Sequence, residues 1–436
     1  MNSRRTIGFW TCTALVVGNV IGMGIFLLPA SLAPYGLNAL IGWGVTLLGC
    51  LALARVFAHL AHLLPHADGP YGYIRQTLGD LTAYMALWAY WVSLWLTNAA
   101  LATGVVGYMG VVAPSLAHLQ PTAFALVLLW SFVAVNLLGV RSGGGVQIVT
   151  TILKLLPMAA IAAVGAWTLF TAPASYVAHL PPTPVTLPGI MAASTIALFA
   201  MLGIESASVP ATRVDNPGRT IPRATMAGTV VTATIYIIVS TVPLLLVPQS
   251  DLARAAAPFA LLMERFGGTG ASRWLSLFVV VSGLGALNGW TLLVGELTRT
   301  MAAHGVLPAR FGRCNRFGAP AFALLATGLL ASVMVWMSYS KSLVSAFTFI
   351  TLVVTSANLP LYLCCSLALA VLWRREAAGR SALAIALLGA AYVVFAFIGS
   401  GHEPSLLAMG LIAAGLPLYA FMRRRRPAAP AGATAP

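Results

Sequence analysis

GNVIGMGIF, residues 18–26, places three glycines within seven residues of the first long apolar segment. Each glycine weakens a helix by about 1 kcal/mol relative to alanine, and an interruption inside lipid leaves backbone N–H and C=O groups unpaired. Membrane segments that break in this way are typical of sites where the freed backbone groups bind a ligand. The sequence therefore predicts a first membrane segment that is interrupted near residues 20–24.

The composition excludes an ordinary soluble protein. Of the 436 residues, 59% are hydrophobic and only 8% are charged, and the mean hydropathy is +0.91. These values are typical of proteins that cross the membrane many times. Taking about 20 apolar residues per crossing, we predict 12 transmembrane helices in one membrane domain, residues 1–436. The spans are expected at residues 8–32, 37–64, 80–112, 122–139, 146–171, 188–211, 222–247, 271–303, 318–339, 342–373, 382–400 and 404–422.

The net charge is +15, and most of the basic residues fall on the side of the membrane where they are expected. With the N-terminus inside, 18 of the 24 Lys and Arg residues fall on the cytoplasmic side, as is typical of membrane proteins. Attraction to the anionic lipid bilayer is a secondary effect of these charges. The basic residues are spread over short loops, so nucleic acid is excluded as a partner. We expect a cell (inner) membrane protein with both termini cytoplasmic and a disordered tail at 427–436.

Few ionisable residues lie inside the predicted spans, and each is a candidate functional group. Lys154 lies in the fifth span and Glu296 in the eighth. Glu205 lies in the sixth span between Gly203 and Pro210, which predicts a second interruption there. Glu205 could equally be a buried structural acid that does not touch a ligand.

The two interruptions fall at equivalent places if the first ten spans form two inverted repeats. The repeats would cover residues 8–171 and 188–373, followed by accessory spans at 382–422. Paired interruptions at equivalent positions indicate a transport site. The freed amides at the positive end of a half-helix would bind an anionic group such as a carboxylate.

Several of these features have simpler interpretations. Gly18 and Gly22 could form a G-x-x-x-G packing surface. His59, His62 and His66 share one face of the second span and could bind metal, but a wet interfacial face is favoured, so no metal and no cofactor is predicted. The evenly spaced Trp88, Trp91 and Trp95 are expected to pack or to anchor the helix at the interface.

The sequence LNGWT, residues 287–291, suggests another break, with Trp290 as a site-lining aromatic residue. No nucleophile–base or metal constellation occurs in mid-span, so an enzyme is not predicted. A channel would require a repeated filter or a ring of pore-lining residues, and the sequence contains neither.

Five motifs in order resemble a known family: GNVIGMGIFLLPA, GPYGYIRQTLG, YWVSLWLTN, GIESASVPATRVDNPGRTIPRAT and GWTLLVGELTRTMAAHGVLP. The chain resembles the amino acid–polyamine–organocation (APC) transporters over nearly its whole length, most closely the arginine/agmatine and related basic amino acid/polyamine antiporters. The resemblance implies an all-α integral membrane protein with the LeuT-type five-plus-five inverted repeat and broken helices 1 and 6. It implies sodium-independent exchange of an amino acid for an amine by alternating access. Proton participation and a homodimer stay open.

The resemblance also implies roles for individual residues. The backbone of the first-span break would bind the substrate carboxylate, and the sixth-span backbone its amino group. Tyr90 would belong to a gate and Glu205 to a proton-sensing or conformational network. The substrate-binding residues implied are Val20, Ile21, Gly22, Met23, Gly24, Ser93, Asn98, Phe199 (in place of a gating tryptophan), Leu202, Trp290 (over a cationic head group) and Val353.

Departures from the antiporter pattern at Met23, Phe199, Val353 and Lys154 favour an alternative substrate. Met23 replaces a small serine, and Val353 replaces a serine that faces the guanidinium in the arginine carrier. A guanidinium would lose a polar partner there, which is costly for a buried charge. Lys154 replaces an apolar residue; proton-coupled carriers and neutral amino-acid exchangers have a lysine there, whose ammonium would stand in for a sodium ion and exchange protons.

The other interpretation of Lys154 is a lysine that snorkels to the surface, since it lies about 12 Å into its helix. The alternative function is therefore a neutral amino-acid exchanger or a proton-coupled amino-acid transporter.

Overall fold

The computed structural model describes residues 8–425 except 66, 68, 117–118, 140–143, 180–181, 205–216, 339 and 376–378. The described residues form helices joined by turns, and none of them is in a strand. The all-α class expected from the sequence is confirmed. The α-helices are α1 (Phe9–Val20), α2 (Gly24–Leu32), α3 (Leu37–Leu63), α4 (Gly69–Leu78), α5 (Asp80–Val112), α6 (Pro121–Leu137), α7 (Gly144–Thr171), α8 (Ser175–Ala178), α9 (Leu187–Ala200), α10 (Pro217–Leu246), α11 (Gln249–Arg254), α12 (Pro258–Ala303), α13 (Ala321–Met337), α14 (Leu343–Arg374), α15 (Arg380–Gly399), α16 (His402–Ala413) and α17 (Gly415–Arg425).

Eight helical segments in the described ranges are long and apolar enough to cross a bilayer. They lie in α3, α5, α7, α10, α12, α14, α15 and the α16–α17 segment. Large apolar side chains such as Leu48, Leu329 and Leu388 are exposed on the outer helix surfaces, which suits contact with lipid rather than water. The chain is therefore a multi-pass membrane protein.

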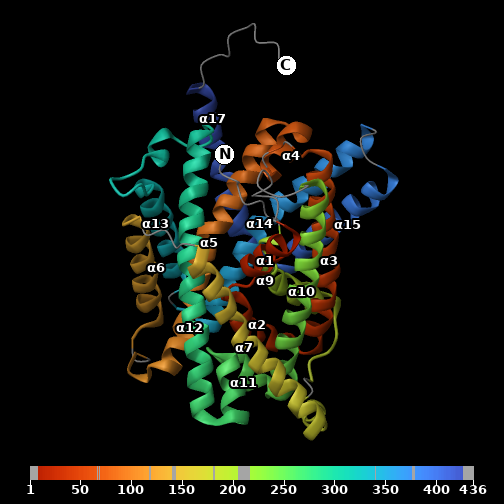
Figure 1. Ribbon diagram of the computed structural model, residues 1–436, viewed down its shortest axis with the longest axis vertical. Coiled ribbons are helices and arrows are strands. Elements are labelled where there is room, and N and C mark those ends of the chain that lie inside the picture. The colour runs from red at the N-terminus through yellow and green to blue at the C-terminus, as the bar shows by residue number, and fades with distance from the viewer. Residues whose placement is uncertain are drawn as a thin grey trace.

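The long helices run roughly along the long axis of the molecule (Figure 1). Helices α4 and α17 lie at one end of that axis, and α11 lies at the other. Helix α5 packs against α12 and α14, while α3 packs against α9 and α10. The middle of α5 is buried almost without interruption from Trp91 to Val106, so this helix forms much of the core.

The first apolar segment is divided into two helices. Helix α1 ends at Val20, Ile21 has an extended backbone conformation (φ −71°, ψ 97°), and α2 begins at Gly24. All nine residues of α2 are buried. The non-helical residues thus coincide with the glycine-rich stretch in which the sequence predicts an interruption.

The end of α9 has a related geometry. The helix ends at Ala200 and continues into a turn in which Gly203 has a φ of +102°. Only glycine adopts this conformation without strain, so a side chain at position 203 would disfavour the turn. Glu205 and the rest of the predicted second interruption lie outside the described residues.

The predicted break at LNGWT is wrong. Residues 287–291 are helical, and the non-helical conformation inside α12 is at Gly268 (φ +74°). A single glycine inside a helix costs only about 1 kcal/mol, which tertiary packing readily offsets. The predicted last span at 404–422 lies within the candidate membrane segment His402–Arg424, in which a turn at Ala414 separates α16 from α17.

Candidate functional site

A cavity of about 30 Å³ lies at the gap between α1 and α2. One water needs about 10–15 Å³ by this measure, so the cavity holds about two waters, and a larger ligand requires side chains to move. It is lined by Val20, Gly22, Gly24, Ile25, Thr97, Leu101, Phe199, Ala200, Leu202, Tyr236 and Trp290. Six of the residues implied by the family resemblance, from three separate segments of the chain, therefore meet here.

Two glycines bring the backbone to the cavity. A Cβ atom on Gly22 would have no heavy atom within 4 Å, so this residue faces open space. A Cβ atom on Gly24 would lie 2.7 Å from Cε1 of Phe199, so only glycine allows the ring to approach this closely. The glycines therefore leave the main chain accessible on one side and let an aromatic ring cover it on the other.

Both helix ends at the gap carry backbone groups suited to a zwitterion. The first amides of α2, from Gly24 onward, lack partners within their own helix, and they lie at the positive end of its dipole. The last carbonyls of α1, up to Val20, lie at the negative end of the other dipole. A carboxylate is favoured at the amides and an ammonium at the carbonyls, which is the charge pattern of an α-amino acid.

Tyr236 of α10 lines the cavity, and the sequence analysis did not identify it. Its hydroxyl donates a hydrogen bond to the Val20 carbonyl at 3.0 Å, and the side chain is fully buried. Its ring packs edge-on against Trp43. The only sequence signal was a hydroxyl-bearing ring in the apolar run TATIYIIVS, which gives no indication of its partner on α1.

Phe199 of α9 covers one side of the cavity. The side chain is 7% exposed, and its ring meets Phe347 of α14 edge-to-face, with centroids 6.0 Å apart. An aromatic residue at the gating position implied by the resemblance is thus placed between the cavity and α14. Thr97, Leu101, Ile25 and Ala200 are further lining residues that sequence reasoning missed.

Lys154 lies behind the gap rather than in the lining. Its Nζ is 3.5 Å from the Gly18 carbonyl oxygen, and the side chain is 4% exposed. Gly18 belongs to the last turn of α1, whose carbonyls lack partners within the helix, and a cation is favoured at a helix C-terminus. A buried ammonium in this position does not fit the snorkelling interpretation.

Met23 and Val353 are fully buried, but neither is among the cavity-lining residues. A Cβ atom added to Gly104 would lie 3.1 Å from Cγ of Met23, and one added to Gly283 would lie 2.9 Å from Sδ of Met23. The methionine therefore packs against two glycines, on α5 and α12. The expectation that Met23 makes the pocket more apolar is not supported by this orientation.

The remaining implied residues that the structure describes also lie outside the lining. Ser93 donates a hydrogen bond to the Tyr90 carbonyl at 2.7 Å and lies 3.3 Å from Asn358 Oδ1. Asn98 is buried, and among the described atoms its Oδ1 has no hydrogen-bond partner. Ile21 is fully buried and contributes no lining atoms.

Other candidates from the sequence have ordinary surroundings. Glu296 is partly exposed and pairs with Arg299 at 2.8 Å, so it is not a buried intramembrane acid. His66 lies outside the described residues, and within those ranges no three metal-ligating side chains cluster. The indole N–H groups of Trp88 and Trp91 bond to the Leu411 carbonyl and to Thr298, which indicates packing roles.

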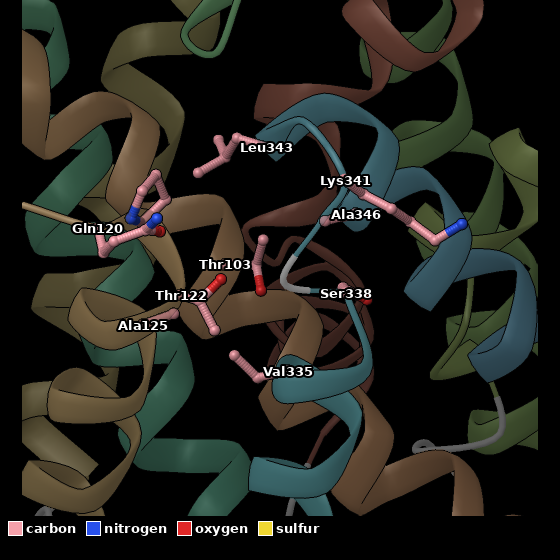
Figure 2. Close-up of a pocket in the computed structure, with 10 residues that line it drawn as sticks. Thr103, Gln120, Thr122, Ala125, Val335, Ser338, Lys341, Leu343 and Ala346 are labelled. Atoms are coloured by element: carbon pink, nitrogen blue, oxygen red, sulfur yellow. The ribbon is translucent and has the colours of Figure 1, made fainter.

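A second cavity of about 60 Å³ lies between α5, α6, α13 and α14. Figure 2 shows the hydroxyl-bearing Thr103, Thr122 and Ser338 around it, while the Lys341 side chain extends away. The Lys341 ammonium instead lies 4.7 Å from the centre of the Phe349 ring. None of the residues implied by the resemblance lines this cavity, so the cavity at the α1–α2 gap is the candidate site.

Tyr236→Phe is expected to weaken substrate binding as well as folding. Removing the hydroxyl leaves the buried Val20 carbonyl without this donor, which costs about 1–3 kcal/mol. Tyr108→Phe is the matched control, because its hydroxyl donates to the Phe26 carbonyl at 2.7 Å, outside the cavity. Both variants should lower the melting temperature, but only Tyr236→Phe should weaken binding, by about tenfold. Equal affinities for the two variants in a binding titration would contradict a site role for Tyr236.

Comparison with known proteins agrees with the motifs. The amino acid permease family model matches residues 7–413. The putrescine transporter PotE of Haemophilus influenzae is 29% identical over 95% of this chain and 97% of its own length. A putative arginine/ornithine antiporter of Bacillus subtilis is 30% identical over 98% of each chain, and the cadaverine/lysine antiporter of Escherichia coli K12 is 34% identical over 78% of this chain and 77% of its own. The chain therefore belongs to the amino acid permease family.

Proposed function

We propose that this membrane protein is an antiporter that exchanges a basic amino acid for an amine by alternating access, without sodium. The observation that carries the proposal is the cavity at the α1–α2 gap, where a helix N-terminus and a helix C-terminus meet. Its relatives are named for putrescine, for arginine and ornithine, and for cadaverine and lysine. These compounds are all amines or basic amino acids, which favours the same substrate class here.

The proposed topology has 12 spans. The eight long segments are supplemented by four shorter apolar ones: α1 with α2, α6, α9 with the residues that follow it, and α13. Helices α1–α2 would form one span broken at residues 21–23, and α9 would begin the equivalent broken span. Residues 8–171 and 188–373 would be the two inverted repeats, with 382–422 as accessory spans. An even number of spans and the basic loops support cytoplasmic termini in the inner membrane.

The proposed binding mode uses backbone groups for the part that all amino acids share. The amides near Gly22 and Gly24 would hold the carboxylate, and the carbonyl end of α1 would hold the ammonium. Trp290 would cover a cationic side chain, and Phe199 would close the site before the opposite side opens. Lys154 would supply the charge that sodium provides in related folds, so the mechanism requires no cofactor.

One observation favours a second candidate function, the exchange or proton-linked transport of a neutral amino acid. The described lining contains no Asp or Glu side chain, and its side chains are mainly apolar. A cationic head group would meet Trp290, but it would have no carboxylate partner among these residues. A neutral side chain would avoid that cost, and the buried Lys154 would fit proton coupling.

The test is counterflow by purified protein in liposomes. Competitors would be arginine, agmatine, lysine, putrescine, alanine, leucine and methionine, each with and without sodium and a proton gradient. We expect only the cationic compounds to compete and uptake to require substrate inside the vesicles. Competition by the neutral compounds alone would replace the first proposal with the second, and the absence of counterflow with every compound would reject a carrier.

Trp290→Leu is expected to weaken the binding of cationic substrates selectively. A cation–π contact contributes about 1–2 kcal/mol in a desolvated site, which corresponds to a loss of about 5- to 30-fold in affinity. Trp274→Leu is the control, because Trp274 lies on the same helix and is largely exposed. Inhibition constants for putrescine and leucine would be measured on both variants. An equal loss for both compounds would contradict a cation-binding role for Trp290.

A further inference from the structure

A groove of about 540 Å³ lies between α1, α3 and α10, and it shares no lining residue with the substrate cavity. Its lining includes Phe9 of α1, Arg55 and His59 of α3, and Arg223 and Met226 of α10. Helices α3 and α10 pack directly against each other and run side by side in Figure 1. The groove lies toward the α4 end of the molecule, because α3 ends shortly before α4 begins.

The polar part of the groove is basic. Arg55 and Arg223 come from different helices and are both exposed. His59 follows Arg55 by one turn, with its Nδ1 2.9 Å from the Arg55 carbonyl oxygen. The groove lining contains no Asp or Glu, and the ion pairs of the described residues involve neither arginine. Two guanidinium groups that line one groove offer the paired donors that a phosphate accepts.

The apolar part extends from the arginines along the lipid-facing helix surfaces. Seven residues make about two helical turns, so Leu48 lies on the same face of α3 as Arg55, and Val230 lies on the same face of α10 as Arg223. Leu48 is 70% exposed and Val230 is 43% exposed. Met226 connects Arg223 to this apolar strip. A cationic group at one end and an apolar strip along the membrane are the two features that an anionic phospholipid requires of its binding site.

We propose that the groove binds one anionic phospholipid. Its phosphate lies between Arg55 and Arg223, and an acyl chain follows Met226, Leu48 and Val230. The lining residue Phe9 is the first residue of α1, so the lipid contacts the helix whose other end forms the substrate cavity. The site is distinct from the general attraction of basic loops to the membrane, because it joins two arginines of different helices in one groove.

Native mass spectrometry of the detergent-purified protein tests the proposal. Phosphatidylglycerol and phosphatidylcholine would be titrated against the wild type, Arg55→Gln/Arg223→Gln and Arg313→Gln/Arg316→Gln. The last pair is the control, because it removes the same charge from exposed arginines outside the groove. We expect one tight phosphatidylglycerol on the wild type and the control, weakened about tenfold or more in Arg55→Gln/Arg223→Gln because charge-assisted contacts are lost. Equal weakening in both double variants, or equal retention of phosphatidylcholine by the wild type, would overturn the proposal.

A second variant keeps the charge and fills the groove. Met226→Trp should also weaken phosphatidylglycerol binding, and it keeps the test decisive if the arginine double variant fails to fold. Inorganic phosphate should displace the lipid only weakly, since it lacks the acyl chain. Displacement at concentrations similar to those of the lipid itself would show a simple anion site and reject the lipid. The readout is bound lipid, so its outcome does not depend on whether the proposed transport is correct.

Discussion

Gly22→Val is expected to abolish transport of every substrate while leaving the protein folded. A Cβ atom at Gly22 would have no heavy atom within 4 Å, and Gly22 is not among the residues with positive φ. Valine is therefore accommodated by the backbone. Its two methyl groups would project into a cavity of about 30 Å³ and cover the amides at the start of α2. We expect at least a hundredfold lower counterflow, equivalent to about 2.7 kcal/mol or more.

Gly44→Val is the matched control. Gly44 lies on α3, is exposed, and also has open space where a Cβ would stand. Both variants should elute as monodisperse protein with melting temperatures close to the wild type. Only Gly22→Val should lose counterflow in liposomes, for amines as well as amino acids. Transport by Gly22→Val at more than a small fraction of the wild-type rate would show that substrate does not occupy this cavity.

Local features of the sequence predicted much of the fold. Hydropathy located the apolar helices, because each must cover about the thickness of the bilayer. The glycines at 18–26 predicted where α1 gives way to α2, because the loss of helix propensity acts on the residues that carry it. At LNGWT the same reasoning failed. The helix that contains this glycine, α12, packs against α5, and the sequence of one segment does not contain such a contact.

The candidate site was less predictable, because its contacts join distant segments. Tyr236 and Val20 are 216 residues apart, and Lys154 and Gly18 are 136 apart. Spacing along one helix cannot identify such partners. The side chain of Met23 shows a second limit. Next to a helix break, the 3.6-residue period no longer relates a residue's number to the direction of its side chain. The sequence could therefore not predict that the Met23 side chain points toward Gly104 and Gly283.

Lys154→Ala is expected to lower transport by about tenfold or more and to flatten its dependence on pH. The ammonium lies 3.5 Å from the Gly18 carbonyl oxygen in the last turn of α1. Its removal takes a cation from the negative end of that helix and leaves buried carbonyls without this donor, at a cost of about 1–3 kcal/mol. Initial rates of counterflow would be measured from about pH 5 to about pH 9, a range centred on neutral pH. Lys341→Ala is the control, because that ammonium lies over the Phe349 ring and Lys341 does not line the cavity at the α1–α2 gap.

Lys154→Arg separates a structural cation from a proton-coupling group. Arginine keeps the positive charge at the end of α1, but it does not release its proton in proteins. If Lys154 couples transport to protons, Lys154→Arg should retain the melting temperature of the wild type and still lose the pH dependence. If the lysine only stabilises the carbonyl end of α1, the arginine variant should keep both. A wild-type pH profile in Lys154→Ala would exclude Lys154 from coupling altogether, and the remaining candidate in that role would be Glu205.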